Sequence, residues 1–130
     1  FGLVAMPGQS TYNAAKFAVR GFTESVRMDM LVGKRPVQVT CVHPGGIKTA
    51  IARNARNTAG EDHDATARFF DEKLARMSAE KAASIILDGM LAGQARVLVG
   101  VDAHALHTVG KVLGARYQDI FSTFARKVMP

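Results

Sequence analysis

An uninterrupted helical pattern over residues 10–33 constrains the fold of this chain more than any other feature. No proline occurs between Tyr12 and Leu31, and apolar residues recur at spacings of three and four. We expect Ser10 or Thr11 to cap this helix at its start and Gly33 to end it. The sequence therefore predicts a long amphipathic helix, with an apolar stripe of Ala15, Val19, Phe22, Val26 and Met30 and a smooth stripe of Ala14, Ala18 and Gly21.

Two short β-branched runs follow this helix, and both are typical of strands buried on both faces. The first covers 37–43 and stops at Pro44, and the second covers 96–100. Between them, Ser78 and Glu80 indicate the start of a helix over 78–93. Because helices and buried strands alternate, the chain is predicted to be α/β with a parallel sheet.

Two further segments complete the single domain that we expect. Residues 44–77 are mostly polar and are predicted to form a mobile lid that is not part of the core. Residues 102–128 are predicted to form a helical segment whose apolar face packs against the domain or a second subunit. The apolar side chains on that face are Leu113, Tyr117, Ile120, Phe124 and Val128.

Composition restricts the class of protein. The formal charge of +6 is spread along the chain, which has no tryptophan, so nucleic-acid binding is not expected. Cys41 is the single cysteine and lies within the first strand run, so it has no disulfide partner in the chain. No apolar run reaches the roughly 20 residues needed to span a membrane. These features predict a cytoplasmic protein with no membrane partner.

Tyr12 and Lys16 are the residues that point most directly to chemistry. They are four positions apart on the first helix, so their side chains share one face. A phenol with an ordinary pKa near about 10 is a weak acid at neutral pH, and an adjacent ammonium favours its ionised form. A tyrosine and a lysine at this spacing are therefore suited to general acid–base catalysis. The alternative is a helix-start tyrosine beside a solvated lysine.

Three motifs in this order resemble the short-chain dehydrogenase/reductase family: Tyr12-Asn-Ala-Ala-Lys16, Val42-His-Pro-Gly-Gly-Ile-Lys-Thr49 and Ser78-Ala-Glu-Lys-Ala-Ala83. The resemblance implies an oxidoreductase that interconverts a secondary alcohol and a ketone or aldehyde by hydride transfer to or from NAD or NADP. It implies that Tyr12 is the acid or base and that Lys16 assists it and holds the cofactor ribose. The remaining residues that it implies for cofactor binding are Pro44, Gly45, Ile47 and Thr49. The candidates for substrate binding are Phe69, Phe70 and Met77.

The family's catalytic serine and its glycine-rich cofactor turn have no counterpart in this sequence. We therefore expect the chain to correspond to the C-terminal half of the family fold, with the N-terminal cofactor half absent. We expect this piece to be inactive by itself and the parent enzyme to form a homo-oligomer, a dimer or a tetramer. The alternative from another class is a non-catalytic association module or proteolytic remnant that self-associates through its helices.

Several residues have a structural interpretation beside the functional one. Thr49 could cap a short helix, and His43 is more typical of a hydrogen-bonded histidine at a strand end. His104 and His107 have a spacing that can bind metal, but no carboxylate or cysteine is obvious nearby, so no metal site is predicted. Phe69 and Phe70 could cover the core instead of a substrate.

Overall fold

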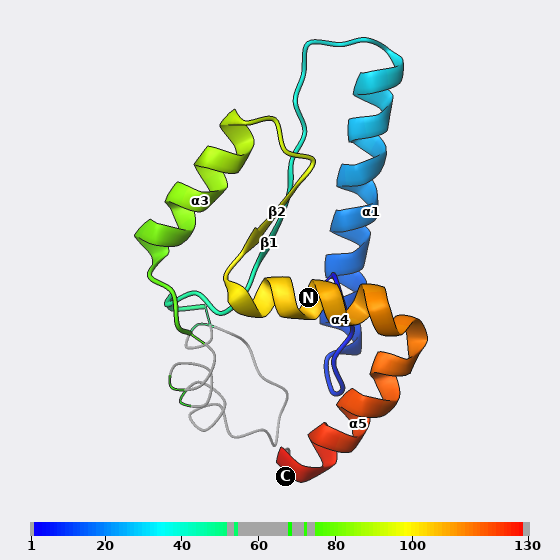
Figure 1. Cartoon of the computed structure of the whole chain (residues 1–130), viewed down its shortest axis with the longest axis vertical. Helices are drawn as coiled ribbons and strands as arrows, with labels where there is room; N and C mark the ends of the chain where they lie inside the picture. The colour runs from blue at the N-terminus through cyan, green and yellow to red at the C-terminus, as the bar shows by residue number, and fades with distance from the viewer. Residues whose placement is uncertain (1, 52–53, 55–67, 69–71, 73–74, 129–130) are drawn as a thin grey trace.

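The computed structural model describes residues 2–51, 54, 68, 72 and 75–128, and these residues form an α/β unit (Figure 1). Its helices are α1 (Ser10–Val32), α3 (Ala79–Leu91), α4 (Val101–Leu113) and α5 (Tyr117–Val128), with a 3₁₀ turn, η2 (Gly114–Arg116), between the last two. Its strands are β1 (Cys41–Pro44) and β2 (Arg96–Val99). Most of the loop expected over 44–77, including Phe69 and Phe70, lies outside the described residues.

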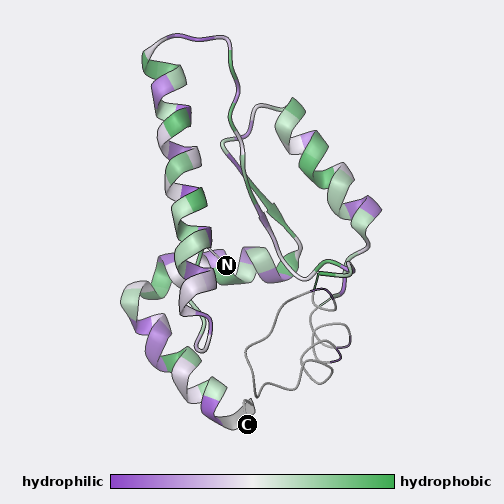
Figure 2. Cartoon of the chain, turned by 180° about the vertical axis from the view of Figure 1, so that it is seen from behind, coloured by the Kyte–Doolittle hydropathy of each residue, from purple (hydrophilic) through white to green (hydrophobic). Residues whose placement is uncertain are grey.

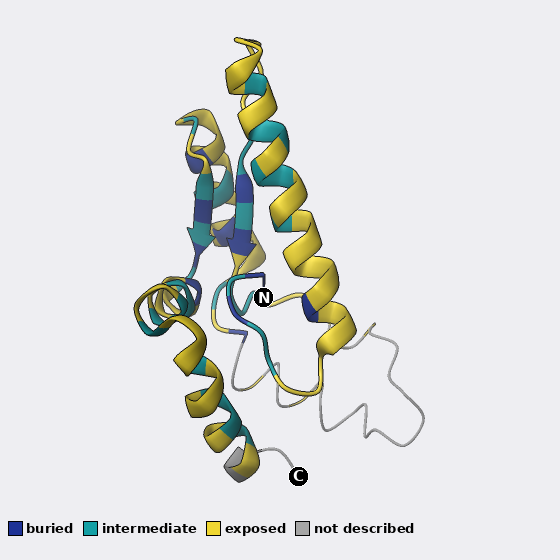
Figure 3. Cartoon of the chain, turned by 90° about the vertical axis from the view of Figure 1, so that its right-hand side faces the viewer, coloured by how far each residue is buried: buried dark blue, intermediate teal, exposed yellow. Residues whose placement is uncertain are grey.

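Strands β1 and β2 pair in parallel, with Cys41 opposite Arg96 and Pro44 opposite Val99. Helix α3 is the crossover between them, as parallel pairing requires. It lies on one side of the sheet, while α1 lies on the other (Figures 1 and 3). The start of α1 and the carboxyl ends of both strands point toward the same end of the molecule. The structure therefore has the parallel α/β arrangement expected from the sequence, in the form of a two-stranded sheet.

The core is small and lies between the sheet and α3. Its buried members are Ala82, Val97 and Val99, and Val99 is completely inaccessible to solvent. Partly buried side chains pack around them, namely Val42, Ile47, Met77, Ile85 and Ile86. Figure 3 shows the buried residues concentrated in the strands, with the outer surfaces of the helices exposed. Burial of these aliphatic side chains is what joins the crossover helix to the sheet.

The expected core-facing stripe of α1 is largely exposed in this structure. Phe22 is 72% exposed, and Val19 also faces solvent, although Val26 and Met30 are half-buried. Apolar residues are visible along much of the helix in Figure 2. The physical reason is that α1 packs mainly against β1, and this narrow sheet cannot cover a helix of 23 residues. Leu87 and Met90 of α3 are likewise exposed.

Helix ends agree with the sequence pattern at some positions and differ at others. Ser78 caps α3 as predicted, since its hydroxyl accepts a hydrogen bond from the Lys81 amide at 3.3 Å. The residue before α1 is Gln9, with no side-chain cap, so the cap expected from Ser10 or Thr11 is wrong. Gly33 follows α1 as expected, and its amide donates to the Asp29 carbonyl at 2.9 Å.

Two other expected elements are shorter or divided. Residues 37–40 are not part of β1, whose pairing begins at Cys41 because its partner β2 begins only at Arg96. The helical segment over 102–128 is two helices, because Gly114 has φ 53° and ψ −136°. A positive φ cannot continue a right-handed helix and is easily adopted only by glycine.

Candidate active site

Tyr12 and Lys16 lie together at the start of α1, as their spacing predicts. The Lys16 ammonium nitrogen is 5.3 Å from the centroid of the Tyr12 ring. This distance is within the range of a cation–π interaction. Tyr12 is 44% exposed and Lys16 is exposed, so both side chains are accessible to a small molecule. The arrangement places a positive charge over the ring of an exposed phenol.

Asn13, directly after Tyr12, anchors this end of the helix. It is 6% exposed, and it is the one buried residue of α1. Its side-chain amide donates to the Met6 carbonyl at 2.8 Å, and its backbone amide donates to the Gln9 carbonyl at 2.8 Å. Its Oδ1 atom is buried with no hydrogen-bond partner among the described residues. Asn13 therefore ties the segment before α1 to the turn that carries Tyr12, a role that sequence reasoning missed.

The turn at Pro44–Lys48 follows the carboxyl end of β1 and is fixed from several directions. The Gly45 amide donates to the Val99 carbonyl at 2.8 Å, and the Gly46 carbonyl accepts from the Arg76 and Met77 amides at 3.0 and 3.3 Å. The Lys48 amide donates to the Met77 carbonyl at 2.8 Å. In this parallel bridge Ile47 is the residue opposite Met77, so its own amide points away from that segment.

The other predicted site residues differ in how exposed they are. Thr49 is exposed, and its hydroxyl accepts from the Ile51 amide at 3.5 Å, which fits the interpretation of a turn cap. Met77 packs beside the buried core and pairs with Ile47, so part of its surface is covered by other residues of the chain. The structure thus brings Tyr12 together with Lys16, and Ile47 together with Met77. Phe69 and Phe70 lie outside the described residues.

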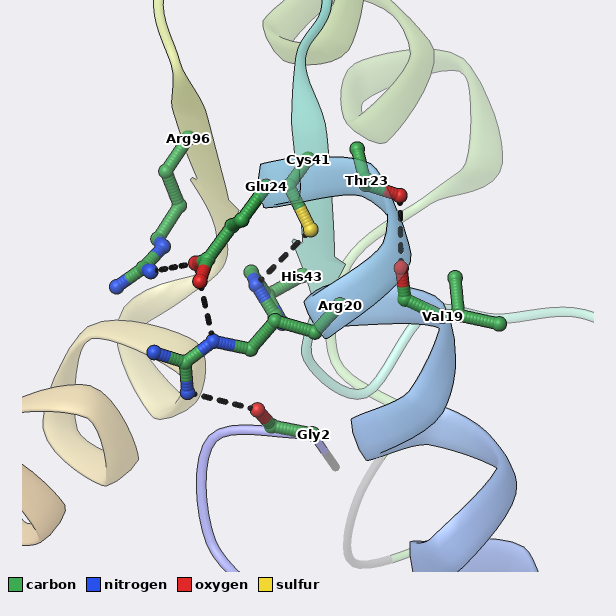
Figure 4. Close-up of polar contacts among 8 residues, drawn as sticks. All are labelled: Gly2, Val19, Arg20, Thr23, Glu24, Cys41, His43 and Arg96. Carbon is green, nitrogen blue, oxygen red and sulfur yellow. Dashed lines mark hydrogen bonds and ion pairs between the residues drawn. The ribbon is translucent and has the colours of Figure 1, made fainter. Parts of the chain in front are cut away.

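A charged cluster that was not foreseen joins α1 to the sheet. The Glu24 carboxylate accepts hydrogen bonds from Arg20 at 3.1 Å and from Arg96 (Figure 4). Arg20 also donates to the Gly2 carbonyl at 3.0 Å. Partial burial favours the protonated acid, but hydrogen bonds from both arginines and their charges outweigh it, so the pKa of Glu24 lies below its ordinary value. The cluster fixes α1 against β2 and against the segment that precedes the helix.

Cys41 and His43 are buried side by side on β1, where the sulfur lies 3.4 Å from the His43 Nε2 atom (Figure 4). Burial raises the pKa of the Cys41 thiol, and the Glu24 carboxylate acts in the same direction. These contacts support the structural interpretation of His43. On α4, partial burial lowers the pKa of His107, and nearby positive charges, Arg96 first among them, add to the effect. No group of three metal-ligating side chains occurs within the described part of the chain.

The described residues form a parallel α/β unit with a Tyr–Lys pair on its first helix, an arrangement that fits the class of dehydrogenases. Comparison with known proteins supports this class. A family model described as short chain dehydrogenase matches residues 1–60, which include Tyr12, Lys16 and the turn after β1. The chain therefore resembles the short-chain dehydrogenase/reductase family. No solved structure gives a significant match.

Three relatives illustrate the range of similarity. SadH of Mycobacterium tuberculosis, which bears the name of an oxidoreductase, is 55% identical over 130 residues, covering 100% of this chain and 47% of SadH. YxnA, an uncharacterized oxidoreductase of Bacillus subtilis, is 49% identical over 49 residues, or 38% of this chain and 14% of YxnA. A Drosophila melanogaster dehydrogenase/reductase SDR family protein 7-like is 32% identical over 99 residues, or 75% of this chain and 28% of that protein. The chain thus spans about half the length of SadH.

Proposed function

We propose that the protein to which this chain belongs is an NAD(P)-dependent oxidoreductase that interconverts a secondary alcohol and a ketone or aldehyde. The observation that carries this proposal is the Lys16 ammonium 5.3 Å from the Tyr12 ring, on the exposed start of α1. In the proposed reaction the Tyr12 hydroxyl gives its proton to the carbonyl oxygen, and its phenolate takes a proton from an alcohol in reverse. In this proposal the charge of Lys16 stabilises the negative charge that develops on the phenol oxygen.

The proposed cofactor is NAD or NADP, which supplies or accepts the hydride when it is bound. We assign its contacts to Tyr12 and Lys16 on α1 and to Pro44, Gly45, Ile47 and Thr49 after β1. The turn fits such a group for two reasons. It follows the carboxyl end of a parallel strand, where ligands of α/β sheets bind. The Ile47 amide also points away from its bridge to Met77, so it is directed to donate elsewhere.

The proposed substrate is a small alcohol or carbonyl compound, with Phe69, Phe70 and Met77 as candidate contacts. We further propose that the chain corresponds to the C-terminal half of a doubly wound, Rossmann-like fold and is inactive by itself. Its coverage of 47% of SadH supports this division. The cofactor-selecting residues of the family are expected in the other half, so the choice between NAD and NADP belongs there.

We also propose a cytoplasmic homo-oligomer, a dimer or tetramer, with no nucleic-acid or membrane partner. The exposed face of α1 that carries Ala14, Ala18 and Gly21 supports close packing against another helix. Within the described ranges, no helix combines the length and the apolar character needed to cross a membrane.

A second candidate function is an association module that works without catalysis. The observation that favours it is the exposed apolar surface of α1, where Phe22, Leu31 and Val32 all face solvent. Such a surface is unusual for a monomer and is typical of a region that packs against another protein. In this hypothesis Tyr12 and Lys16 have no chemical role, and their replacement would leave every measured property of the assembly unchanged.

The two hypotheses are separated by Tyr12→Phe in the full-length protein. We expect at least about a hundredfold loss of NADH- or NADPH-dependent reduction across a panel of ketones and aldehydes, because the proton donor is removed. The matched control is Tyr117→Phe, which removes the hydroxyl of the chain's other tyrosine. Equal activities of wild type and Tyr12→Phe would eliminate the proposed role of Tyr12. Failure of the wild type to oxidise either cofactor with any compound would favour the association module.

A further inference from the structure

Asp102 connects the start of α4 to the turn after β1. It is the second residue of α4, and its Oδ2 atom accepts a hydrogen bond from the Gly46 amide at 2.6 Å. The surrounding glycines make this approach possible. A Cβ atom at Gly45 would lie 2.0 Å from the Asp102 Oδ1 atom, and one at Gly100 would lie 2.5 Å from it. The missing side chain at Gly45 therefore makes room for a carboxylate of the chain itself.

This hydrogen bond differs in kind from the others that hold the turn. Gly45, Gly46 and Lys48 otherwise bond to main-chain groups of Val99, Arg76 and Met77. Among these contacts, the one with Asp102 is the one made by a side chain, so it can be removed by substitution without breaking the backbone pairing. A hydrogen bond to an ionised acceptor is also stronger than one between neutral groups.

Both main-chain polar groups of Gly46 are hydrogen-bonded. Its carbonyl accepts from the Arg76 and Met77 amides, and its amide donates to Asp102. These contacts fix the direction of the following peptide, and with it the Ile47 amide that we assign to the cofactor. If Asp102 releases the Gly46 amide, the turn loses its contact with α4, and rotation of the 45–46 segment is then opposed by the backbone hydrogen bonds of Gly45 to Val99 and of Gly46 to Arg76 and Met77.

We propose that Asp102 is a positioning residue that orients the Pro44–Ile47 turn for binding of the nicotinamide cofactor. The cofactor part of this inference rests on the proposed function, whereas the orientation of the turn does not. Asp102 acts through Gly46 and has no assigned contact with substrate. Its loss should therefore weaken cofactor binding and leave the rate at saturating cofactor nearly unchanged.

The test uses Asp102→Ala and Asp102→Asn in the full-length protein. Asn keeps an acceptor oxygen at the same distance from the main chain but carries no charge. If the position of this oxygen matters and its charge does not, Asp102→Asn should retain most of the orientation of the turn. Asp88→Asn on α3 is the matched control, because it removes one exposed carboxylate elsewhere. Thermal melts accompany each variant to show that it folds, and Asp102→Asn remains informative if Asp102→Ala does not fold.

The first readout is hydrogen exchange of the Gly46 amide, measured by NMR or mass spectrometry without cofactor. We expect at least about tenfold faster exchange in Asp102→Ala, a smaller change in Asp102→Asn and none in Asp88→Asn. The second readout is the KM for the cofactor against kcat. We expect KM to rise about tenfold in Asp102→Ala, with kcat changed less than about twofold and KM partly restored in Asp102→Asn.

Unchanged Gly46 exchange in Asp102→Ala, or in Asp102→Asn if the alanine variant does not fold, would overturn the positioning role. A fall in kcat at constant KM would overturn its link to cofactor binding. If the wild type shows no cofactor-dependent activity, the proposed function fails, and the exchange result alone then decides whether Asp102 orients the turn.

Discussion

Glu24 on α1 and Arg96 at the start of β2 form an ion pair although 72 positions separate them in the sequence. Arg20 shares the same carboxylate oxygen, so one acidic side chain lies between two guanidinium groups. The pair connects the helix that carries Tyr12 to the strand on the far side of β1. We infer that it sets the position of α1 against the sheet, since the apolar side chains of this helix contribute so little buried area there.

Replacement of Glu24 by Gln should lower the free energy of unfolding at pH 7 by about 1 kcal/mol, a value kept small because the carboxylate is partly exposed. The folded-state pKa of Glu24 is lowered, so its stabilising effect is present above the unfolded pKa and is lost as pH falls through the lowered folded value. Wild type should therefore lose stability below about pH 4.5, and Glu24→Gln should lose less over this range. Urea unfolding at a series of pH values measures both effects.

Asp29→Asn is the matched control for this prediction, because it removes one exposed carboxylate from the same helix. It should leave stability within about 0.5 kcal/mol of wild type. If Glu24→Gln behaved like Asp29→Asn at every pH, the cluster would be a surface ion pair with no part in fixing α1.

Replacement of Tyr117 by Phe should destabilise the fold by about 1 kcal/mol. The Tyr117 hydroxyl accepts a hydrogen bond from the Ala5 amide at 2.9 Å, and this contact joins α5 to the segment before α1. Phe keeps the ring, including its edge contact with Phe121 at 5.3 Å between centroids, but leaves the Ala5 amide unsatisfied. Thermal unfolding measures the change, and Tyr12→Phe, at a more exposed phenol, should give a smaller one. An unchanged melting temperature in Tyr117→Phe would show that the Tyr117 hydrogen bond contributes nothing to stability.

Local sequence signals predicted the elements and the contacts that depend on neighbouring positions. The spacing of Tyr12 and Lys16 fixes their approach because both belong to one helix. Ser78 and Glu80 indicated the start of α3, and Pro44 indicated the end of β1. In each case the relevant partner lies within a few residues, so periodicity and capping rules are sufficient.

Long-range pairings were not accessible in the same way. Nothing local to Glu24 distinguishes Arg96 as its partner, and nothing local to Asp102 points to Gly46. These contacts exist because the β1–α3–β2 crossover brings distant segments together, at the start of β2 for Glu24 and Arg96 and beyond the carboxyl ends of both strands for Asp102 and Gly46. The sequence pattern overestimated the burial of the apolar face of α1 for a related reason. Periodicity identifies the apolar face of α1, but whether that face is covered depends on how much sheet is present, and two strands cover little of it.

Two helical glycines should respond to alanine in opposite ways. A Cβ atom at Gly89 in α3 would lie 2.3 Å from the Val97 Cγ2 atom, inside the buried core. Gly89→Ala should therefore destabilise the fold by about 1–3 kcal/mol through overpacking. At Gly21 in α1 no atom lies within 4 Å of an added Cβ, so Gly21→Ala should stabilise an isolated copy by up to about 1 kcal/mol. Chemical denaturation of both variants measures these differences.

Gly21→Ala also tests the proposed oligomer. If the smooth face of α1 packs against a second copy, the added methyl group should weaken association even while it favours the helix. Sedimentation over a range of concentrations would show a shift toward monomer. A variant that is more stable and equally associated would place the interface on another surface.

The Cys41 thiol should react slowly with thiol reagents in the folded protein. It is buried beside His43, and burial raises the pKa of its thiol, so little of the reactive thiolate is present at neutral pH. Because Cys41 is the single cysteine of the 130 residues, labelling of this chain reports on it alone. With Ellman's reagent at pH 8 we expect the folded chain to react more than about tenfold slower than the same chain in denaturant.

The Cys41 thiol should change the free energy of unfolding with pH in the direction opposite to Glu24, since a raised folded pKa favours the folded state at low pH. Stability should therefore fall as pH rises above about 9, and less so in Cys41→Ala. Equal labelling rates with and without denaturant would show that β1 is accessible at Cys41 and that the sheet does not close over this position.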